Sequence, residues 1–151
     1  LPVEVVDRVC HNLPYMKGAK ETISYLKEQN IRVVCFSGGF RNATSFAKEI
    51  LGFDADFSNV LHSKDGILTG KVGGDMMFDW SKGDMLMRLQ SLLGISPAET
   101  MVVGDGANDL SMFQHADIRV AFCAKPILKR EATHVVDEKD LTKIVDICKM
   151  I

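Results

Sequence analysis

The sequence predicts an α/β domain built around a mainly parallel sheet. Its apolar residues alternate between a helical period and short strand-like runs. The segment Ile31 to Phe36 is nearly continuously apolar, which is typical of a strand buried on both faces. The 151 residues, of which 46% are hydrophobic, are enough for one domain with its own core. No repeat or linker divides the pattern.

Helices are expected where the apolar residues follow the helical period. Pro14 ends the first helix, and Gly52 and Gly94 end two others as left-handed caps. Ser81 with Asp84 resembles a capping box. The predicted helices cover Val3 to about Asn12, about Lys17 to Gln29, about Arg41 to Leu51, Ser81 to Leu93, about Asn108 to His115, and Asp140 to Met150, and the stripe of the fourth is Met85, Leu86, Leu89, Leu92 and Leu93.

Strands beyond the first are expected from β-favouring runs between turn signals. Two short strands should pair around Asp65-Gly66, a strong hairpin signal, as a small antiparallel appendage. The other three should belong to the main sheet. The predicted strands are Phe57 to His62, Ile67 to Val72, Thr100 to Val103, Ile118 to Phe122, and His134 to Val136.

Composition excludes several function classes. The net charge of -2 and the scattered Lys and Arg residues argue against nucleic acid as a partner. No apolar run approaches the roughly 20 residues needed to cross a bilayer, so we expect no membrane partner and a cytoplasmic protein. The four cysteines and four histidines have no ligand spacing, so we predict reduced thiols and assign the histidines no chemistry.

Ser37, Gly38 and Gly39 stand between a predicted strand and a predicted helix. Two glycines let the backbone approach a ligand closely, and the Ser37 hydroxyl and the following amides can donate to an oxyanion. The segment is therefore a candidate phosphate cradle. An ordinary strand-to-helix turn is the alternative.

Lys82 falls in the first turn of its predicted helix, where the helix dipole is already positive. A bound phosphoryl group would offset this unfavourable placement, and Lys82 would neutralise its charge. A solvated surface lysine is the alternative.

The run Gly104-Asp105-Gly106-Ala107-Asn108-Asp109 also joins a strand to a helix. Two carboxylates and an amide in one turn repel each other unless a cation lies between them, and hard oxygen ligands suit Mg²⁺. Asn108 as a helix cap and Asp109 as a first-turn acid would be a structural alternative, but this leaves Asp105 unexplained. A dinucleotide fingerprint fits less well, because Asp109 stands where the third glycine belongs.

In chain order, Ser37-Gly38-Gly39-Phe40, Lys82-Gly83-Asp84 and Gly104 to Asp109 resemble the second, third and fourth motifs of the haloacid dehalogenase superfamily. The resemblance is closest to phosphoserine phosphatases and covers nearly the whole chain. It implies a Rossmann-like three-layer core and transfer of phosphate to an aspartate and then to water, with Mg²⁺. The implied roles are phosphate binding by Ser37, Gly38, Gly39, Lys82 and Asn108, catalysis by Lys82, and metal binding by Asp105 and Asp109.

The same resemblance implies a domain plan. Residues 1–14 would be the remnant of a helical cap, and residues 15–151 the phosphatase core with a small hairpin near 57–72. The central strand that carries the first motif, and most of the cap, are expected to be lacking.

The first motif of the superfamily, DxDx[TS], supplies the nucleophile and the acid/base. Asp54-Ala55-Asp56-Phe57-Ser58 fits it literally. We reject this match, because the nucleophile must end a buried strand and Asp54 follows a helix. Since the chain opens with Leu1 instead of methionine, we expect a missing N-terminal segment of the same protein to carry the motif. The 151 residues alone should then be inactive and poorly folded, with unpaired sheet edges.

Three hypotheses result. The first is a Mg²⁺-dependent phosphomonoesterase acting on a small phosphorylated substrate, which we expect to be phosphoserine. The second is a phosphatase for another small phosphate ester, and the third is a non-catalytic phosphate-binding module. For the enzyme, alanine at Lys82 or Asp105 is expected to remove turnover and leave the fold largely intact.

Overall fold

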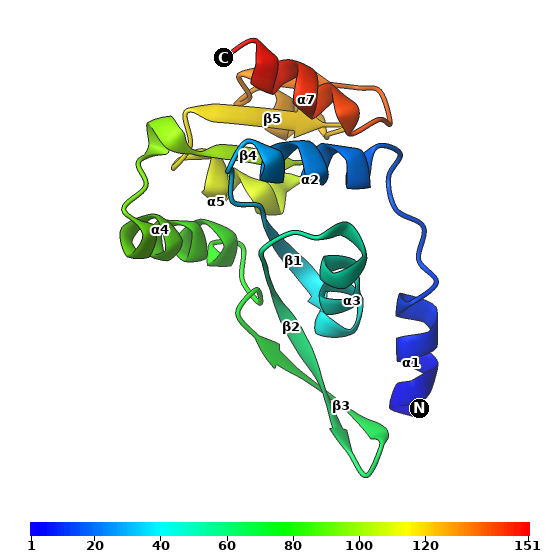
Figure 1. Ribbon diagram of the computed structural model, residues 1–151. Coiled ribbons are helices and arrows are strands. Elements are labelled where there is room, and N and C mark those ends of the chain that lie inside the picture. Colours follow the sequence, from blue (N-terminus) through cyan, green and yellow to red (C-terminus); the bar gives the residue numbers. More distant parts are fainter. The chain divides into compact units, whose positions relative to one another are not determined.

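The computed structural model describes all 151 residues, which form two compact units. One unit contains residues 1–77 and 140–151, and the other contains residues 78–139. Each unit has its own three-stranded sheet, in the order β1-β2-β3 and β4-β5-β6 (Figure 1). This arrangement confirms the α/β class. No helix combines the length and apolar character that spanning a bilayer requires.

The sheet of the first unit is mixed. β1 (Val34–Phe40) pairs in parallel with the first half of β2 (Ala55–Lys64). The second half of β2 pairs in antiparallel fashion with β3 (Ile67–Gly74). The hairpin turn is as predicted, with positive φ at Asp65 (52°) and Gly66 (76°). The hairpin projects from the sheet and is continuous with it, since β2 runs from the sheet into it (Figure 1).

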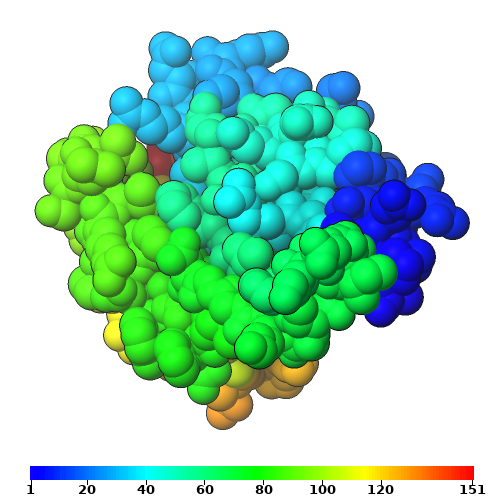
Figure 2. Space-filling model, turned by 90° about the horizontal axis from the view of Figure 1, so that it is seen from below, coloured from blue at the N-terminus to red at the C-terminus, as the bar shows by residue number.

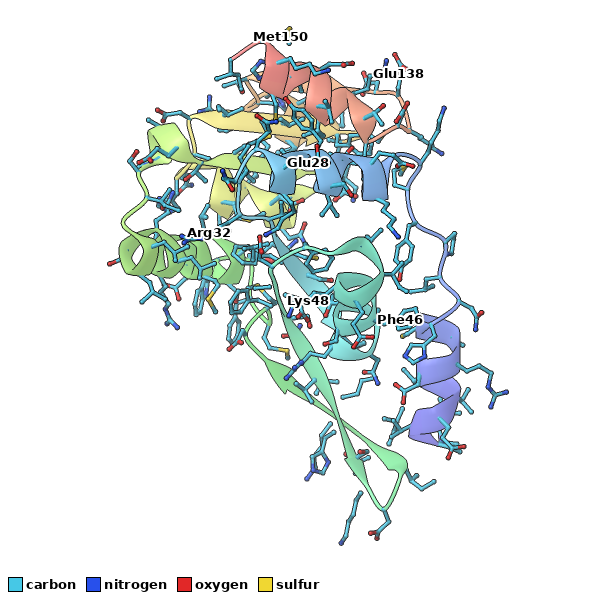
Figure 3. The ribbon with its side chains drawn as sticks, in the orientation of Figure 1. Glu28, Arg32, Phe46, Lys48, Glu138 and Met150 are labelled. Atoms are coloured by element: carbon cyan, nitrogen blue, oxygen red, sulfur yellow. The ribbon has the colours of Figure 1, made fainter.

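Four helices belong to this unit: α1 (Val3–Cys10), α2 (Ala19–Glu28), α3 (Arg41–Leu51) and α7 (Thr142–Lys149). α3 packs against β1 and β2, and α1 packs against α3. The ring of His11 stacks on Phe46 at a centroid distance of 4.1 Å, and Figure 3 shows Phe46 pointing from α3 toward α1. Asn42 on α3 donates to Asp7 on α1 at 2.7 Å.

The start of α7 is anchored to the start of α2. The amide of Leu141 donates to the carbonyl of Lys17 at 2.8 Å. Hydrogen bonds from the side chain and backbone of Thr142 lower the pKa of Asp140. A Cβ at Gly18 would lie 2.7 Å from the Asp140 carboxylate, so only glycine allows this close approach. The last helix thereby completes the first unit.

The first residues of the chain cover the edge of the hairpin. The Val3 amide donates to the Gly66 carbonyl at 2.9 Å, and the Leu68 amide donates to the Leu1 carbonyl at 2.8 Å. In Figure 2 this N-terminal segment, dark blue, lies beside the green hairpin. The tip of β3 is therefore not a bare strand edge.

The second unit has a wholly parallel sheet, the 13-residue helix α4 and several single-turn helices. Its core is centred on β5, where Val120 and Ala121 are fully buried, and on Leu128, which is also fully buried. The elements in order are α4 (Ser81–Leu93), η1 (Pro97–Glu99), β4 (Met101–Gly104), η2 (Ala107–Asp109), α5 (Leu110–Phe113), β5 (Ile118–Phe122), α6 (Pro126–Lys129) and β6 (His134–Val136).

The first strand differs from its prediction. It begins at Val34 and runs through Ser37, Gly38 and Gly39, with a register shift between Phe36 and Phe40. Ile31 lies outside the strand and is 43% exposed. None of the strand's residues is fully buried, and it pairs with β2 alone as an edge strand.

α4 and α5 also depart from expectation. Ser81 makes no capping box, and its hydroxyl accepts from the Phe78 amide at 3.0 Å. Leu92 is 80% exposed, because the buried part of α4 is its first turn and not the predicted leucine stripe. α5 is a single turn preceded by the 3₁₀ turn η2, where the Asp109 carboxylate accepts from the amides of Asp105 and Gly106.

Replacing Asp54 by asparagine should lower the free energy of unfolding by about 1 kcal/mol at pH 7. Asp54 accepts from Lys27 and from the Val33 amide. Burial acts to raise the pKa of Asp54, but these hydrogen bonds hold it below its ordinary value of 3.8. The stability it contributes is therefore present above pH 3.8 and is lost as the pH falls through the lowered pKa.

Urea unfolding of both proteins at pH 7 and at pH 2 measures this contribution, and the difference between them should shrink at the lower pH. Asp137→Asn is the control, because its pair with Lys129 involves a side chain that is 61% exposed. An Asp54 effect of equal size at both pH values would contradict the prediction.

Candidate active site

Ser37, Gly38 and Gly39 form an irregular end of β1 in the first unit. The Gly39 amide donates to the Ser37 hydroxyl oxygen at 3.0 Å, which leaves the Ser37 hydrogen free to donate to another group. Gly38 is exposed, and a Cβ there would meet no atom within 4 Å, so the space above it is open. The segment has the open surface and the donor that an anion cradle requires.

Lys82 is not a solvated surface lysine. Its ammonium lies 2.8 Å from one carboxylate oxygen of Asp109. The two side chains are only 11% and 5% exposed, so water screens the pair weakly. This ion pair fixes the first turn of α4 to η2.

The second carboxylate oxygen of Asp109 accepts from the amides of Asp105 and Gly106, at 2.9 Å and 3.2 Å. A Cβ at Gly104 would lie 2.5 Å from that oxygen, so a larger residue there would displace it. Asp109 therefore holds the whole turn that follows β4.

A second contact joins the first turn of α4 to α5, which directly follows η2. The Gly83 amide donates to the Ser111 hydroxyl at 3.0 Å. A Cβ at Gly83 would overlap the backbone of Ser111, lying 2.7 Å from its carbonyl carbon. Lys82 can reach Asp109 only because the next residue of α4 is a glycine that packs directly on α5.

Asp105 and Asn108 are exposed on the rim of this turn, and the Asp105 carboxylate accepts no hydrogen bond within the protein. An unpaired carboxylate beside a buried one suits Mg²⁺, which prefers oxygen ligands and keeps several waters. Nowhere in the chain do three His, Cys, Asp or Glu side chains gather as a complete metal site. The exposed Asp105 carboxylate is therefore the candidate metal ligand of this turn.

The predicted site residues fall into two groups. Lys82, Asp105, Asn108 and Asp109 come together in the second unit, while the serine and two glycines lie in the first. Two residues that support this turn were not predicted as site residues, namely Gly83 and Ser111. Gly83 stands in the third motif but was given no role, and nothing in the sequence marks Ser111.

The two aspartates of the literal match to the first motif make other contacts in the first unit. Asp54 precedes β2 and binds Lys27 and the Val33 amide. Asp56 accepts from the hydroxyl of Thr44 at 2.7 Å. Both carboxylates are used in the packing of the first unit, which agrees with rejecting them as the nucleophile and acid/base.

Comparison with known proteins identifies the class. Residues 2–117 match the haloacid dehalogenase-like hydrolases, and the chain belongs to this family. It is 59% identical over 145 residues to the phosphoserine phosphatase of Wolinella succinogenes, covering 96% of this chain and 70% of the relative. It is 43% identical over 149 residues to the phosphoserine phosphatase of Methanocaldococcus jannaschii, covering 99% and 71%. The resemblance stated from the motifs is confirmed.

Solved structures of phosphoserine phosphatases are also similar to this chain. A substrate-bound phosphoserine phosphatase complex matches with a TM-score of 0.93 at 43% identity, covering 97% of this chain and 70% of that one. A phospho-aspartyl intermediate analogue of phosphoserine phosphatase matches with a TM-score of 0.92, at the same identity and coverage.

Replacing Lys82 by alanine should destabilise the protein by about 3 kcal/mol or more, because the Asp109 carboxylate would remain buried without its cation. This revises the expectation that alanine at Lys82 leaves the fold largely intact. Adding Asp109→Asn to the same chain removes the unpaired charge, so the double variant should be more stable than Lys82→Ala alone. Urea unfolding of the wild type, both single variants and the double variant measures the coupling. Additive effects would show that the pair contributes nothing.

Proposed function

We propose that this chain forms the phosphate- and metal-binding part of a Mg²⁺-dependent phosphomonoesterase that converts phosphoserine to serine. The observation that carries the proposal is the buried Lys82–Asp109 pair beside the unpaired Asp105 carboxylate. This arrangement stands in a chain that is 59% identical to a phosphoserine phosphatase.

In this proposal the first unit binds the phosphoryl group. The Ser37 hydroxyl donates to one phosphoryl oxygen, since its own oxygen already accepts from Gly39. The exposed backbone of Gly38 allows the anion to approach closely. In the second unit, Asn108 is exposed on the rim of its turn and has a side-chain amide that could donate to a phosphoryl oxygen.

The second unit would supply the charges. Lys82 would neutralise negative charge on the transferring group. The Asp109 carboxylate, 2.8 Å from the Lys82 ammonium, keeps that ammonium in position. Asp105 would ligate Mg²⁺ directly. Asp109, whose two oxygens both accept hydrogen bonds, would add its charge to the metal surroundings. When bound, Mg²⁺ would neutralise phosphoryl charge during transfer.

The attacking carboxylate would come from a further strand that carries the DxDx[TS] motif, and an aspartyl-phosphate would form on it. β1 and β4, whose ends bear the candidate residues, each pair with a strand on one edge only. A free edge of this kind can accept another strand. The motif-bearing segment is accordingly proposed as a partner of this chain.

We expect the 151-residue chain to release no phosphate from phosphoserine with Mg²⁺, and a form extended at its N-terminus by the motif-bearing strand to do so. In the extended form, Asp105→Asn should lower turnover at least a hundredfold, because a metal ligand is lost. Its urea midpoint should not change, since that carboxylate bonds to nothing in the protein.

Asp117→Asn is the matched control, an exposed aspartate of the same unit that should leave turnover unchanged. Mn²⁺ binding to each variant, followed by electron paramagnetic resonance, separates loss of metal from loss of fold. Normal turnover by the 151 residues would disprove the placing of the nucleophile, and unchanged Mn²⁺ binding by Asp105→Asn would disprove the metal site.

The non-catalytic phosphate-binding module stays the second candidate, favoured by the structural use of Asp54 and Asp56. An extended form that binds phosphate and hydrolyses no ester would support it. If the extended form hydrolysed another small phosphate ester faster than phosphoserine, the protein would instead be a phosphatase for that ester.

A further inference from the structure

Asn59 is a buried polar residue that the proposed function does not use. It lies in β2, is 3% exposed, and its side-chain amide makes three hydrogen bonds within the first unit. The amide nitrogen donates to the carbonyls of Gly38 and Met76, each at 3.1 Å. Its oxygen accepts from the Met76 amide at 2.9 Å. The side chain thereby joins the candidate cradle to the loop that follows β3.

The bond to Gly38 acts on one peptide group. The carbonyl of Gly38 and the amide of Gly39 belong to the same planar unit, so fixing one end fixes the other. Asn59 holds the carbonyl end, and the Ser37 hydroxyl oxygen accepts from the amide end. Because the hydroxyl oxygen accepts there, its hydrogen is directed elsewhere.

This peptide group has particular need of an external restraint. It joins two glycines, which lack the Cβ atoms that limit backbone rotation, and it lies where the β1–β2 register is irregular. Without a partner for its carbonyl, the Gly38–Gly39 peptide could rotate and take the Gly39 amide away from Ser37. The donor geometry of the cradle therefore depends on Asn59.

The end of β3 and the loop after it keep Asn59 in place. Gly74 has a φ of 138°, and a Cβ there would lie 2.6 Å from the Cα of Asn59. A glycine at this position lets the loop close over the asparagine, so that the backbone of Met76 can pair with both ends of the amide.

We propose that Asn59 is a positioning residue for anion binding, which orients the Ser37-Gly38-Gly39 cradle through the Gly38 carbonyl without touching the ligand. This inference rests on the proposed phosphate-binding role of the cradle. It adds that the phosphate affinity of the cradle in β1 depends on a buried side-chain amide in the neighbouring strand β2.

The test is titration of the 151-residue chain with inorganic phosphate, followed through the backbone amide resonances of Gly38 and Gly39. Asn59→Leu keeps a comparable volume, adds no charge and removes all three hydrogen bonds. We expect it to raise the phosphate dissociation constant about tenfold, the equivalent of one lost hydrogen bond. Gly74→Ala should act in the same direction, because it displaces Asn59 without changing it.

Ser58→Ala is the matched control. Ser58 is the preceding residue of the same strand, is 4% exposed, and bonds to Thr44 at 2.9 Å on the other side of β2. It should lower stability while leaving the phosphate affinity unchanged. Circular dichroism and urea unfolding show which variants are folded.

The outcomes separate the two proposals. If the wild type is folded by circular dichroism and gives no response at Gly38 and Gly39, the cradle itself is disproved, and the role of Asn59 with it. If the wild type binds phosphate and folded Asn59→Leu binds it equally well, only the positioning role is disproved. If Asn59→Leu and Gly74→Ala both fail to fold while Ser58→Ala folds, Asn59 is purely structural and the inference is overturned.

Discussion

The candidate site of the second unit depends on the ion pair between Lys82 and Asp109. Two charges that are 11% and 5% exposed have lost most of their contact with water, and each is tolerable only because the other is present. The pair also sets geometry. Through its second oxygen Asp109 holds the amides of Asp105 and Gly106, so one carboxylate positions both the cation and the proposed metal ligand.

The close packing around this pair explains the glycines of the two motifs better than backbone flexibility does. Neither Gly83 nor Gly104 has a positive φ. Each is required because a Cβ would occupy the space of Ser111 or of Asp109. The first unit uses glycine differently, leaving the face of Gly38 open while Asn59 holds its carbonyl. In both units a buried polar side chain supports residues that are themselves exposed.

Much of the fold could be predicted because its signals are local. The left-handed caps at Gly52 and Gly94 and the turn at Asp65-Gly66 each depend on one or two residues, and all three were predicted correctly. The strands Ile118–Phe122 and His134–Val136 were also predicted with their observed bounds. Local propensity and hydrophobic runs are sufficient where an element is short and flanked by turns.

The predictions from sequence were wrong where tertiary contacts determine the bounds or the buried face of an element. The leucine stripe of α4 ends in an exposed Leu92, since the helix is buried at its first turn. The start of β1 moved to Val34, because an edge strand begins where its single partner does. For the site, motif residues could be placed from the sequence, but not the partners that hold them. Asn59 and Ser111 are ordinary residues until the fold brings them to Gly38 and Gly83.

The anchoring of α7 bears on how the chain folds during synthesis. The last helix belongs with residues 1–77, so the second unit is an insertion within the first. The contact of Leu141 with Lys17 closes a loop of more than a hundred residues, and contacts this distant form slowly. Residues 78–139, by contrast, make a continuous stretch that can fold as soon as it leaves the ribosome. α7 can therefore join the first unit only after residues 78–139, which are translated before it, have been made.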